Sequence, residues 1–265
     1  MRILFIGDIV GRPGRDIVVR AVPHLVAERQ LDLVVANAEN AAGGSGLTPD
    51  IYKELIAAGV DAITLGDHVY RRREIYPVLE RESNIVRPAN LPDEAVGRSW
   101  VTVKARDGST VGVFCLLGQL YMQPADSPFR VADRVLAAIP SDVRIKFLDF
   151  HAEATSEAQM IGRYLDGRTS AVLGTHTHVP TADECILPGG TAFQCDVGMT
   201  GPFDSILGRR VDRVLETRLT ANPTQFDVAT DDVRLCGSIV DVDPATGHAT
   251  AIERICVRDS DLPAT

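Results

Sequence analysis

The chain has 265 residues, of which 45% are hydrophobic, and its formal net charge at pH 7 is −9. This length and hydrophobic content suffice for one large core or two smaller ones, and they exclude a disordered chain. The negative charge argues against a duplex nucleic-acid binder, because such proteins gain affinity by neutralising phosphates with clustered Lys and Arg.

The N-terminal segment MRILFIGD reaches Asp8 after a short apolar run. That run is too short for a signal peptide, and no part of the sequence approaches the roughly 18 apolar residues that a membrane span requires. The five cysteines form an odd number with no CxxC spacing, which argues against a disulfide framework and against a cysteine zinc site. We therefore expect a cytoplasmic protein with reduced thiols and no membrane attachment.

Six apolar runs rich in β-branched residues alternate with helix-like segments as far as residue 180, which is typical of an α/β domain. One helix is well marked: Thr48 is placed to cap it, Pro49 occupies its first position, and Gly59 ends it. A second helix is expected over residues 156–167. The predicted strands cover residues 2–7, 31–37, 60–66, 112–118, 143–150 and 170–175.

Beyond residue 185 the helical patterns become sparse. Residues 234–243 and 249–258 form two strand-like runs separated by PATG, which predicts an antiparallel pair. No linker, repeat or low-complexity tract divides the chain. We expect a single domain over residues 1–265, with a mixed α/β first part and a β-rich end.

Side chains able to bind metal follow five of the predicted strands. Ligands in α/β sheets gather outside the C-terminal ends of the strands, because the loops there converge on one rim. Oxygen donors mixed with imidazoles suit Mn, Fe or Zn rather than Cu(I) or Ca. The residues at these ends are Asp8, Glu39, Asn40, Asp67, His68, His151, His176 and His178.

Each of these residues taken alone has an ordinary explanation. A lone aspartate after a strand is typical of a turn or a helix cap, and a lone buried histidine is more often hydrogen-bonded than metal-bound. His176 and His178 differ, because residues i and i+2 of a strand face the same side and can direct two imidazoles toward one site. The coincidence of five such strand ends favours a metal site.

Six segments of the sequence carry a resemblance to a known family. They are GDIVGRPGR, NAENAAGGSGLT, RPANLP, DFHAEATSE, GTHTHVPTAD and DVGMTGPFDS, and they extend from residue 7 to about residue 205. In this order they resemble the calcineurin-like metallophosphoesterase superfamily and, within it, the bacterial YmdB-type branch of cyclic nucleotide phosphodiesterases. The resemblance implies a sandwich of two mixed β-sheets flanked by helices, a centre of two divalent metal ions, and hydrolysis of phosphodiesters, with 2′,3′-cyclic nucleotides as substrates.

The resemblance also assigns the metal ligands. One ion would take Asp8, Glu39, Asn40 and His178. The other would share Glu39 as a bridge and would take Asp67, His151 and His176.

Two positions depart from the wider superfamily, and a third departs from the YmdB-type branch. Its Asp-x-His motif is DIV here, so Val10 cannot bind metal and Asn40 would supply the missing donor. Glu39 replaces a bridging aspartate. These two changes fit the YmdB-type branch, but that branch has Gly-Asn-His where this chain has GDH, so Asp67 adds a negative charge.

The implied mechanism gives the two neighbours in GDH different roles. Two dications can share a hydroxide and direct it at phosphorus while they stabilise charge on the phosphoryl oxygens. Asp67 would hold metal. His68 would act as the general acid that protonates the leaving alkoxide, and a histidine is suited to this near pH 7.

Two other functions are weighed against this one. GDIVGRPGR followed by Glu39 imitates the layout of a Rossmann-type oxidoreductase, but its spacing is G-x-x-x-G-x-x-G rather than G-x-G-x-x-G. The same metal ligands would also fit a non-catalytic, metal-dependent nucleotide-binding or regulatory protein; His68 favours the enzyme.

The remaining alternatives stay open at the level of sequence. The metal is Fe or Mn, with Zn as a third candidate. The oligomeric state is open, although homo-oligomers are common among soluble enzymes of this size. Arg12 and Arg15 either approach the substrate or are solvated, and at most one or two of Arg71, Arg72 and Arg73 can face the site.

Overall fold

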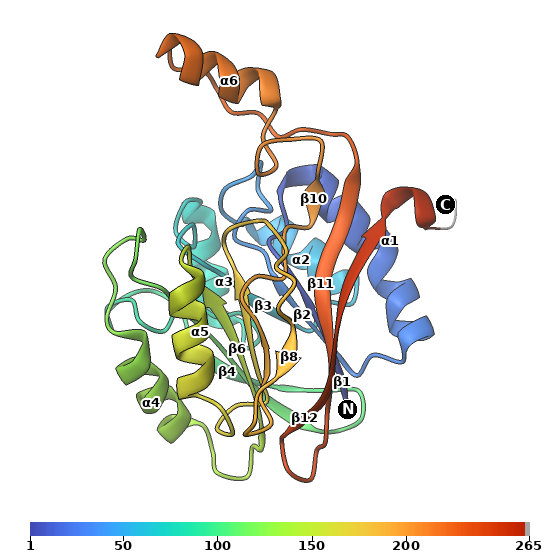
Figure 1. Cartoon of the computed structure of the whole chain (residues 1–265), viewed down its shortest axis with the longest axis vertical. Coiled ribbons are helices and arrows are strands. Elements are labelled where there is room, and N and C mark those ends of the chain that lie inside the picture. The colour runs from blue at the N-terminus through green and yellow to red at the C-terminus, as the bar shows by residue number, and fades with distance from the viewer. Residues whose placement is uncertain (263–265) are drawn as a thin grey trace.

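A computed structural model describes residues 1–262 as two β-sheets packed face to face, with helices on their outer sides (Figure 1). The first sheet is mixed: β1 pairs in parallel with β2 and antiparallel with β11, and β12 pairs antiparallel with β11. Its strands are β10 (Gly201–Pro202), β11 (Val233–Val242), β1 (Arg2–Ile6), β2 (Leu33–Asn37) and β3 (Ala62–Thr64), in this spatial order, with β12 (Ala249–Arg258) beside β11.

The second sheet has a parallel centre and antiparallel edges. β5, β6, β7 and β9 run in one direction, whereas β4 and β8 run in the other. In spatial order the strands are β4 (Trp100–Lys104), β5 (Thr110–Leu117), β6 (Ile145–His151), β7 (Ala171–Thr175), β9 (Ala192–Gln194) and β8 (Cys185–Ile186). The predicted sandwich of two mixed sheets is confirmed.

The helices complete the outer layers. α1, α2 and α3 pack on the first sheet, α4 and α5 pack on the second, and α6 buries no residue and extends away from both sheets (Figure 1). The helices are α1 (Gly11–Arg29), α2 (Pro49–Ala57), α3 (Tyr76–Arg81), α4 (Pro128–Ala138), α5 (Thr155–Tyr164) and α6 (Val211–Thr220), with short 3₁₀ turns η1 (Arg73–Ile75) and η2 (Asp259–Asp261).

The continuous apolar run of β1 follows from its position between two layers. Ile3 and Phe5 face the second sheet, and Leu4 and Ile6 face the helices, because successive residues of a strand point to opposite sides. Phe5 meets Phe147 of β6 edge to face, with ring centroids 5.0 Å apart. This contact joins the two sheets below the C-terminal end of β1.

Most of the elements expected from sequence are present. The Thr48 hydroxyl accepts a hydrogen bond from the Ile51 amide at the start of α2, and Gly59 follows the helix with φ at 103°. The C-terminal pair is β11 and β12. The single-domain prediction spans residues 1–265, so its last part lies outside the described residues, and it stays a prediction. Within the described residues, no helix is both long and apolar enough to cross a membrane.

Candidate metal centre

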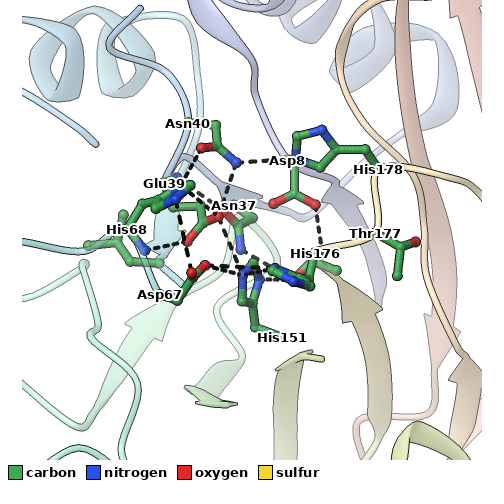
Figure 2. Close-up of polar contacts among 12 residues, drawn as sticks. Asp8, Asn37, Glu39, Asn40, Asp67, His68, His151, His176, Thr177 and His178 are labelled. Carbon is green, nitrogen blue, oxygen red and sulfur yellow. Dashed lines mark hydrogen bonds and ion pairs between the residues drawn. The ribbon is translucent and has the colours of Figure 1, made fainter. Parts of the chain in front are cut away.

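Side chains at or just after the C-terminal ends of β1, β2, β3, β6 and β7 meet at one edge of the sandwich (Figure 2). β1, β2 and β3 are parallel neighbours in one sheet, and β6 and β7 are parallel neighbours in the other. Each strand therefore delivers its following residues to the same place. All eight side chains singled out in the sequence lie there, namely Asp8, Glu39, Asn40, Asp67, His68, His151, His176 and His178.

Four of these side chains form a tight group. Glu39, Asp67, His151 and His176 each offer one donor atom, and these atoms all lie within 4.8 Å of one another. His151 Nε2 is 3.3 Å from Glu39 Oε1 and 3.2 Å from Asp67 Oδ1, and His176 Nδ1 is 3.0 Å from His151 Nε2. This is the ligand set that the resemblance assigns to the second ion.

The electrostatics of this group suit a cation. Burial alone would lower the pKa of His151, but the charge of Glu39 and the hydrogen bond with Asp67 raise it well above its usual value. Burial and the charge of His151 lower the pKa of His176 to about 4, which leaves that imidazole neutral. The carboxylates that favour a positive charge on His151 would also favour a metal ion at this position.

The second group contains Asp8, Asn40 and His178. Asp8 is fully buried, and its Oδ1 has no hydrogen-bond partner among the described residues. Burial raises the pKa of Asp8 to about 7, only partly offset by the charge of His151. A buried carboxylate with an unpartnered oxygen is costly unless a cation lies beside it, so this position fits an ion.

The orientation of Asn40 differs from the one that the ligand assignment needs. Its Nδ2 lies 3.0 Å from Glu39 Oε1 and 3.2 Å from His178 Nε2, whereas its Oδ1 accepts a 2.7 Å hydrogen bond from His68 Nδ1. Ligation through the oxygen therefore requires the amide to turn about its terminal torsion, which is broad and roughly two-fold.

Glu39 lies between the two groups. Oε1 faces Asn40 on one side and His151 on the other, and Oε2 accepts the His68 backbone amide at 3.0 Å. Burial alone would raise the pKa of Glu39, but the charge of His151 and the hydrogen bond with it lower it. Gly66 makes this packing possible, because a Cβ there would lie 2.3 Å from both Glu39 Oε2 and His151 Nε2.

The expectation that His176 and His178 share a strand is wrong. β7 ends at Thr175, and both histidines have a left-handed backbone, with φ at 106° and 65°. Asp196 holds this bend, because its Oδ2 accepts hydrogen bonds from both the amide and the hydroxyl of Thr177, each at 2.8 Å. The bend directs the two imidazoles apart, with His176 against His151 and His178 against Asn40.

The other ring nitrogens of these histidines have partners of their own. His178 Nδ1 donates to the Leu207 carbonyl at 3.1 Å, and His176 Nε2 lies 3.3 Å from Glu153. Such partners fix which nitrogen faces a metal. Glu153 and Asp196 were not among the predicted site residues, although both lie in motifs that carry the family resemblance, DFHAEATSE and DVGMTGPFDS.

A buried carboxylate beneath the centre orients His151. His151 Nδ1 donates to the Thr175 hydroxyl at 2.8 Å, and that hydroxyl donates to Asp149 Oδ1 at 2.6 Å. Asp149 Oδ2 also accepts from Thr64 of β3 and Asn37 of β2. The chain of bonds leaves His151 Nε2 facing the carboxylates and joins the two sheets below the site.

An Asp149→Asn variant is expected to bind metal roughly 10–100-fold more weakly. Two groups donate hydrogen bonds to Oδ2, so the asparagine would keep its oxygen at that position. Its amide nitrogen would take the place of Oδ1 and donate to Thr175. The Thr175 hydroxyl would then donate to His151 Nδ1 and shift the imidazole proton to Nε2, the nitrogen needed for metal. Competition with a chelator, read by metal analysis, measures the change.

Thr64→Val is the matched control for Asp149→Asn. It removes a hydrogen bond to the same carboxylate without altering the Thr175–His151 contact, so its metal affinity should stay near that of the unmodified protein. Thermal unfolding of the metal-free proteins reports any loss of folding. Equal metal affinity in the folded Asp149→Asn variant would contradict the orienting role of Asp149.

Three of the five arginines left open by the sequence have partners outside the eight site residues. Arg15 pairs with Glu54 at 2.9 Å, Arg12 lies 3.5 Å from Asp16, and Arg72 donates to backbone carbonyls of the loop after β2. Arg12 and Arg72 also line a cavity of about 1030 Å³ beside α1, whose lining contains none of the eight site residues. This cavity is therefore separate from the candidate metal centre.

Comparisons with known proteins cover nearly the whole chain. The pattern of one family, described as YmdB-like protein, matches residues 4–255. The chain is 47% identical over 262 residues to the 2′,3′-cyclic-nucleotide 2′-phosphodiesterase of Bacillus subtilis (strain 168), and the match covers 99% of each chain.

Two solved structures are similar as well. One, described as a hypothetical protein from Thermus thermophilus, has a TM-score of 0.91 and 41% identity and covers 97% of this chain and 99% of that one. The other, described as a novel phosphatase from Mycoplasma pneumoniae, has a TM-score of 0.90 and 32% identity and covers 97% and 93%. The likeness thus extends over the strands that carry the site.

Proposed function

The chain belongs to the YmdB-like protein family, and on that premise we propose that it is a metal-dependent phosphodiesterase that hydrolyses 2′,3′-cyclic nucleotides. The observation that carries this proposal is the position of Glu39 between two groups of oxygen and imidazole donors at the meeting point of five strand ends. A relative with 47% identity over the whole chain bears the name of that activity.

Seven residues would hold two metal ions in the arrangement expected from the sequence. Two dications held there would lower the pKa of a bound water and stabilise negative charge on a phosphoryl group. The ion is Fe or Mn in our proposal, with Zn as a third candidate, because the donors suit all three. The residues are Asp8, Glu39, Asn40, Asp67, His151, His176 and His178.

His68 would supply the proton that the leaving group needs. Its side chain is 27% exposed, so a substrate can reach it, and its backbone amide is fixed by Glu39. Its Nδ1 donates to Asn40, which leaves Nε2, 4.0 Å from Asp67 Oδ2, as the nitrogen that can exchange a proton with substrate. Opening a 2′,3′-cyclic phosphate releases a ribose alkoxide, whose departure requires such an acid.

Neither alternative is favoured. A non-catalytic nucleotide-binding or regulatory protein would have no use for a partly exposed acid beside the donor groups. Two of the relatives are named for phosphatase or phosphodiesterase activity. The Rossmann-type alternative is not favoured because the glycine spacing after β1 is not G-x-G-x-x-G. In addition, β1 is followed by Asp8, one of the proposed metal ligands. A cytoplasmic location stays a prediction, and the oligomeric state stays open.

A substrate screen after metal analysis tests the proposal. The purified protein is loaded with Fe(II), Mn or Zn in turn and assayed on phosphomonoesters, linear diesters and both 2′,3′- and 3′,5′-cyclic nucleotides. We expect the highest kcat/KM with 2′,3′-cyclic nucleotides and no turnover after chelation. Bound metal without hydrolysis of any phosphoester would contradict the proposal and favour the non-catalytic alternative.

An Asp67→Asn variant is expected to bind inorganic phosphate more tightly, roughly tenfold in the inhibition constant. The change removes one negative charge beside His151 while it keeps the shape of the side chain. A more positive centre attracts an anion more strongly. Inhibition is measured at fixed metal content in both proteins. Unchanged inhibition with unchanged metal content would mean that Asp67 does not contribute its charge to the site.

A further inference from the structure

Two cysteines face each other across the β11–β12 ribbon. Cys236 and Cys256 are direct partners in the antiparallel register, and their Sγ atoms lie 3.7 Å apart. Residues paired in this way have Cα atoms about 4.5–5.5 Å apart, which is within the range that a disulfide spans. A small rotation of the two side chains would therefore bring the sulfurs to bonding distance.

The two thiols differ in access. Cys256 is exposed, so a reagent in solution can reach its sulfur. Cys236 is only 1% exposed, and burial together with the neighbouring Cys256 sulfur raises its pKa well above its usual value. Reaction with a reagent from solution should therefore begin at Cys256.

We propose that Cys236 and Cys256 are a reversible oxidation site, at which exchange with a small-molecule disulfide joins the outer strand β12 to β11. The Cys256 thiolate attacks one sulfur of the reagent, forms a mixed disulfide and releases one thiolate. The Cys236 sulfur, after losing its proton to solvent, then attacks Cys256 Sγ and releases the second thiolate. In sum, two protein thiols are oxidised and one small disulfide is reduced to two thiols.

The positions of the two cysteines in the sheet indicate what a disulfide between them would do. Cys236 lies in the interior of the first sheet: its carbonyl accepts hydrogen bonds from the Gly7 amide at 3.0 Å and from the Thr200 hydroxyl at 3.1 Å. Cys256 lies on β12, beside β11 (Figure 1). A disulfide would link the outer strand β12 covalently to β11, which lies inside the sheet. It would therefore slow the local separation of β12 from β11.

Cys185 provides an internal comparison. It is also exposed and also lies on an antiparallel strand, but its partner in register is Phe193 rather than a cysteine. The same reagent should therefore leave Cys185 either unreacted or in a mixed disulfide. Proximity of a second thiol, not exposure alone, decides which exposed cysteine becomes cross-linked.

The test uses the full-length protein with its metal content measured before and after treatment. The protein is equilibrated in mixtures of reduced and oxidised glutathione, remaining thiols are alkylated, and peptides are mapped by mass spectrometry. We expect the fraction with a Cys236–Cys256 bond to rise from below about one tenth to above about nine tenths as the buffer becomes oxidising. Cys185→Ser should behave like the unmodified protein, and Cys236→Ser and Cys256→Ser should lose the cross-link.

A second measurement follows the ribbon itself. Amide hydrogen exchange of β12 should slow severalfold in the oxidised protein and should not change in Cys256→Ser under the same buffer. A glutathione adduct that persists on Cys256 without cross-linking would overturn the proposal, as would a folded, unmodified protein whose two thiols stay reduced at every buffer ratio. Unchanged exchange in the cross-linked protein would overturn the stabilising role of the bond.

Discussion

A Glu39→Gln variant is expected to lose its metal ions and to fall below roughly a thousandth of the unmodified activity. Glu39 Oε1 lies between the Asn40 amide and His151 Nε2, so the same carboxylate serves both donor groups. A neutral amide keeps the volume of the side chain but removes the charge that would bind two cations at once. Metal analysis after gel filtration, with kcat/KM on a cyclic nucleotide, measures both losses.

Glu54→Gln is the matched control for this change. Glu54 pairs with Arg15 on the helical side of the first sheet and touches none of the donor groups, so metal content and activity should be preserved. The melting temperature of the metal-free proteins separates a binding defect from a folding defect. If the folded Glu39→Gln variant keeps about two metal ions per chain, the bridging role of Glu39 is wrong.

The strand ends were predictable because their signal is local. A buried strand reads as an apolar run, and the first polar residues after that run mark its C-terminal end. Parallel strands bring the residues at these ends to one edge of the sheet. Asp8, Glu39 and His151 could therefore be placed together without knowledge of the sheet order. The sandwich itself rested on the resemblance, since periodicity alone gives strands and helices but not which sheet each strand joins.

What escaped prediction depends on contacts between distant segments. Thr64 and Asp149 are 85 positions apart and lie in different sheets, and only the packing of those sheets brings the threonine hydroxyl to the carboxylate. The bend at His176 could not be predicted from the local sequence either, because Asp196, which holds it, belongs to the segment after β9. Asn40 lies at the expected edge, but its orientation depends on His68, a neighbour from the next strand end.

A His68→Ala variant is expected to keep its metal ions and to hydrolyse 2′,3′-cyclic nucleotides roughly 10²–10⁴-fold more slowly. His68 contacts the donor groups through Asn40 and Glu39 but is not among the seven proposed ligands. Its role is to give a proton to an alkoxide, which is a poor leaving group. The loss should therefore depend on the leaving group rather than on the phosphoryl group.

That dependence distinguishes acid catalysis from a positional effect. A p-nitrophenyl diester releases an acidic phenol that departs without a proton, so the His68→Ala variant should lose far less activity on it than on the cyclic nucleotide. His24→Ala, which changes an exposed histidine paired with Glu28 on α1, should lose no activity on either substrate. An equal loss on both substrates at unchanged metal content would mean that His68 shapes the site through Asn40 and Glu39. It would then not be the proton donor, and the acid would have to be sought among the other groups exposed at this edge that are not proposed ligands, such as Glu153.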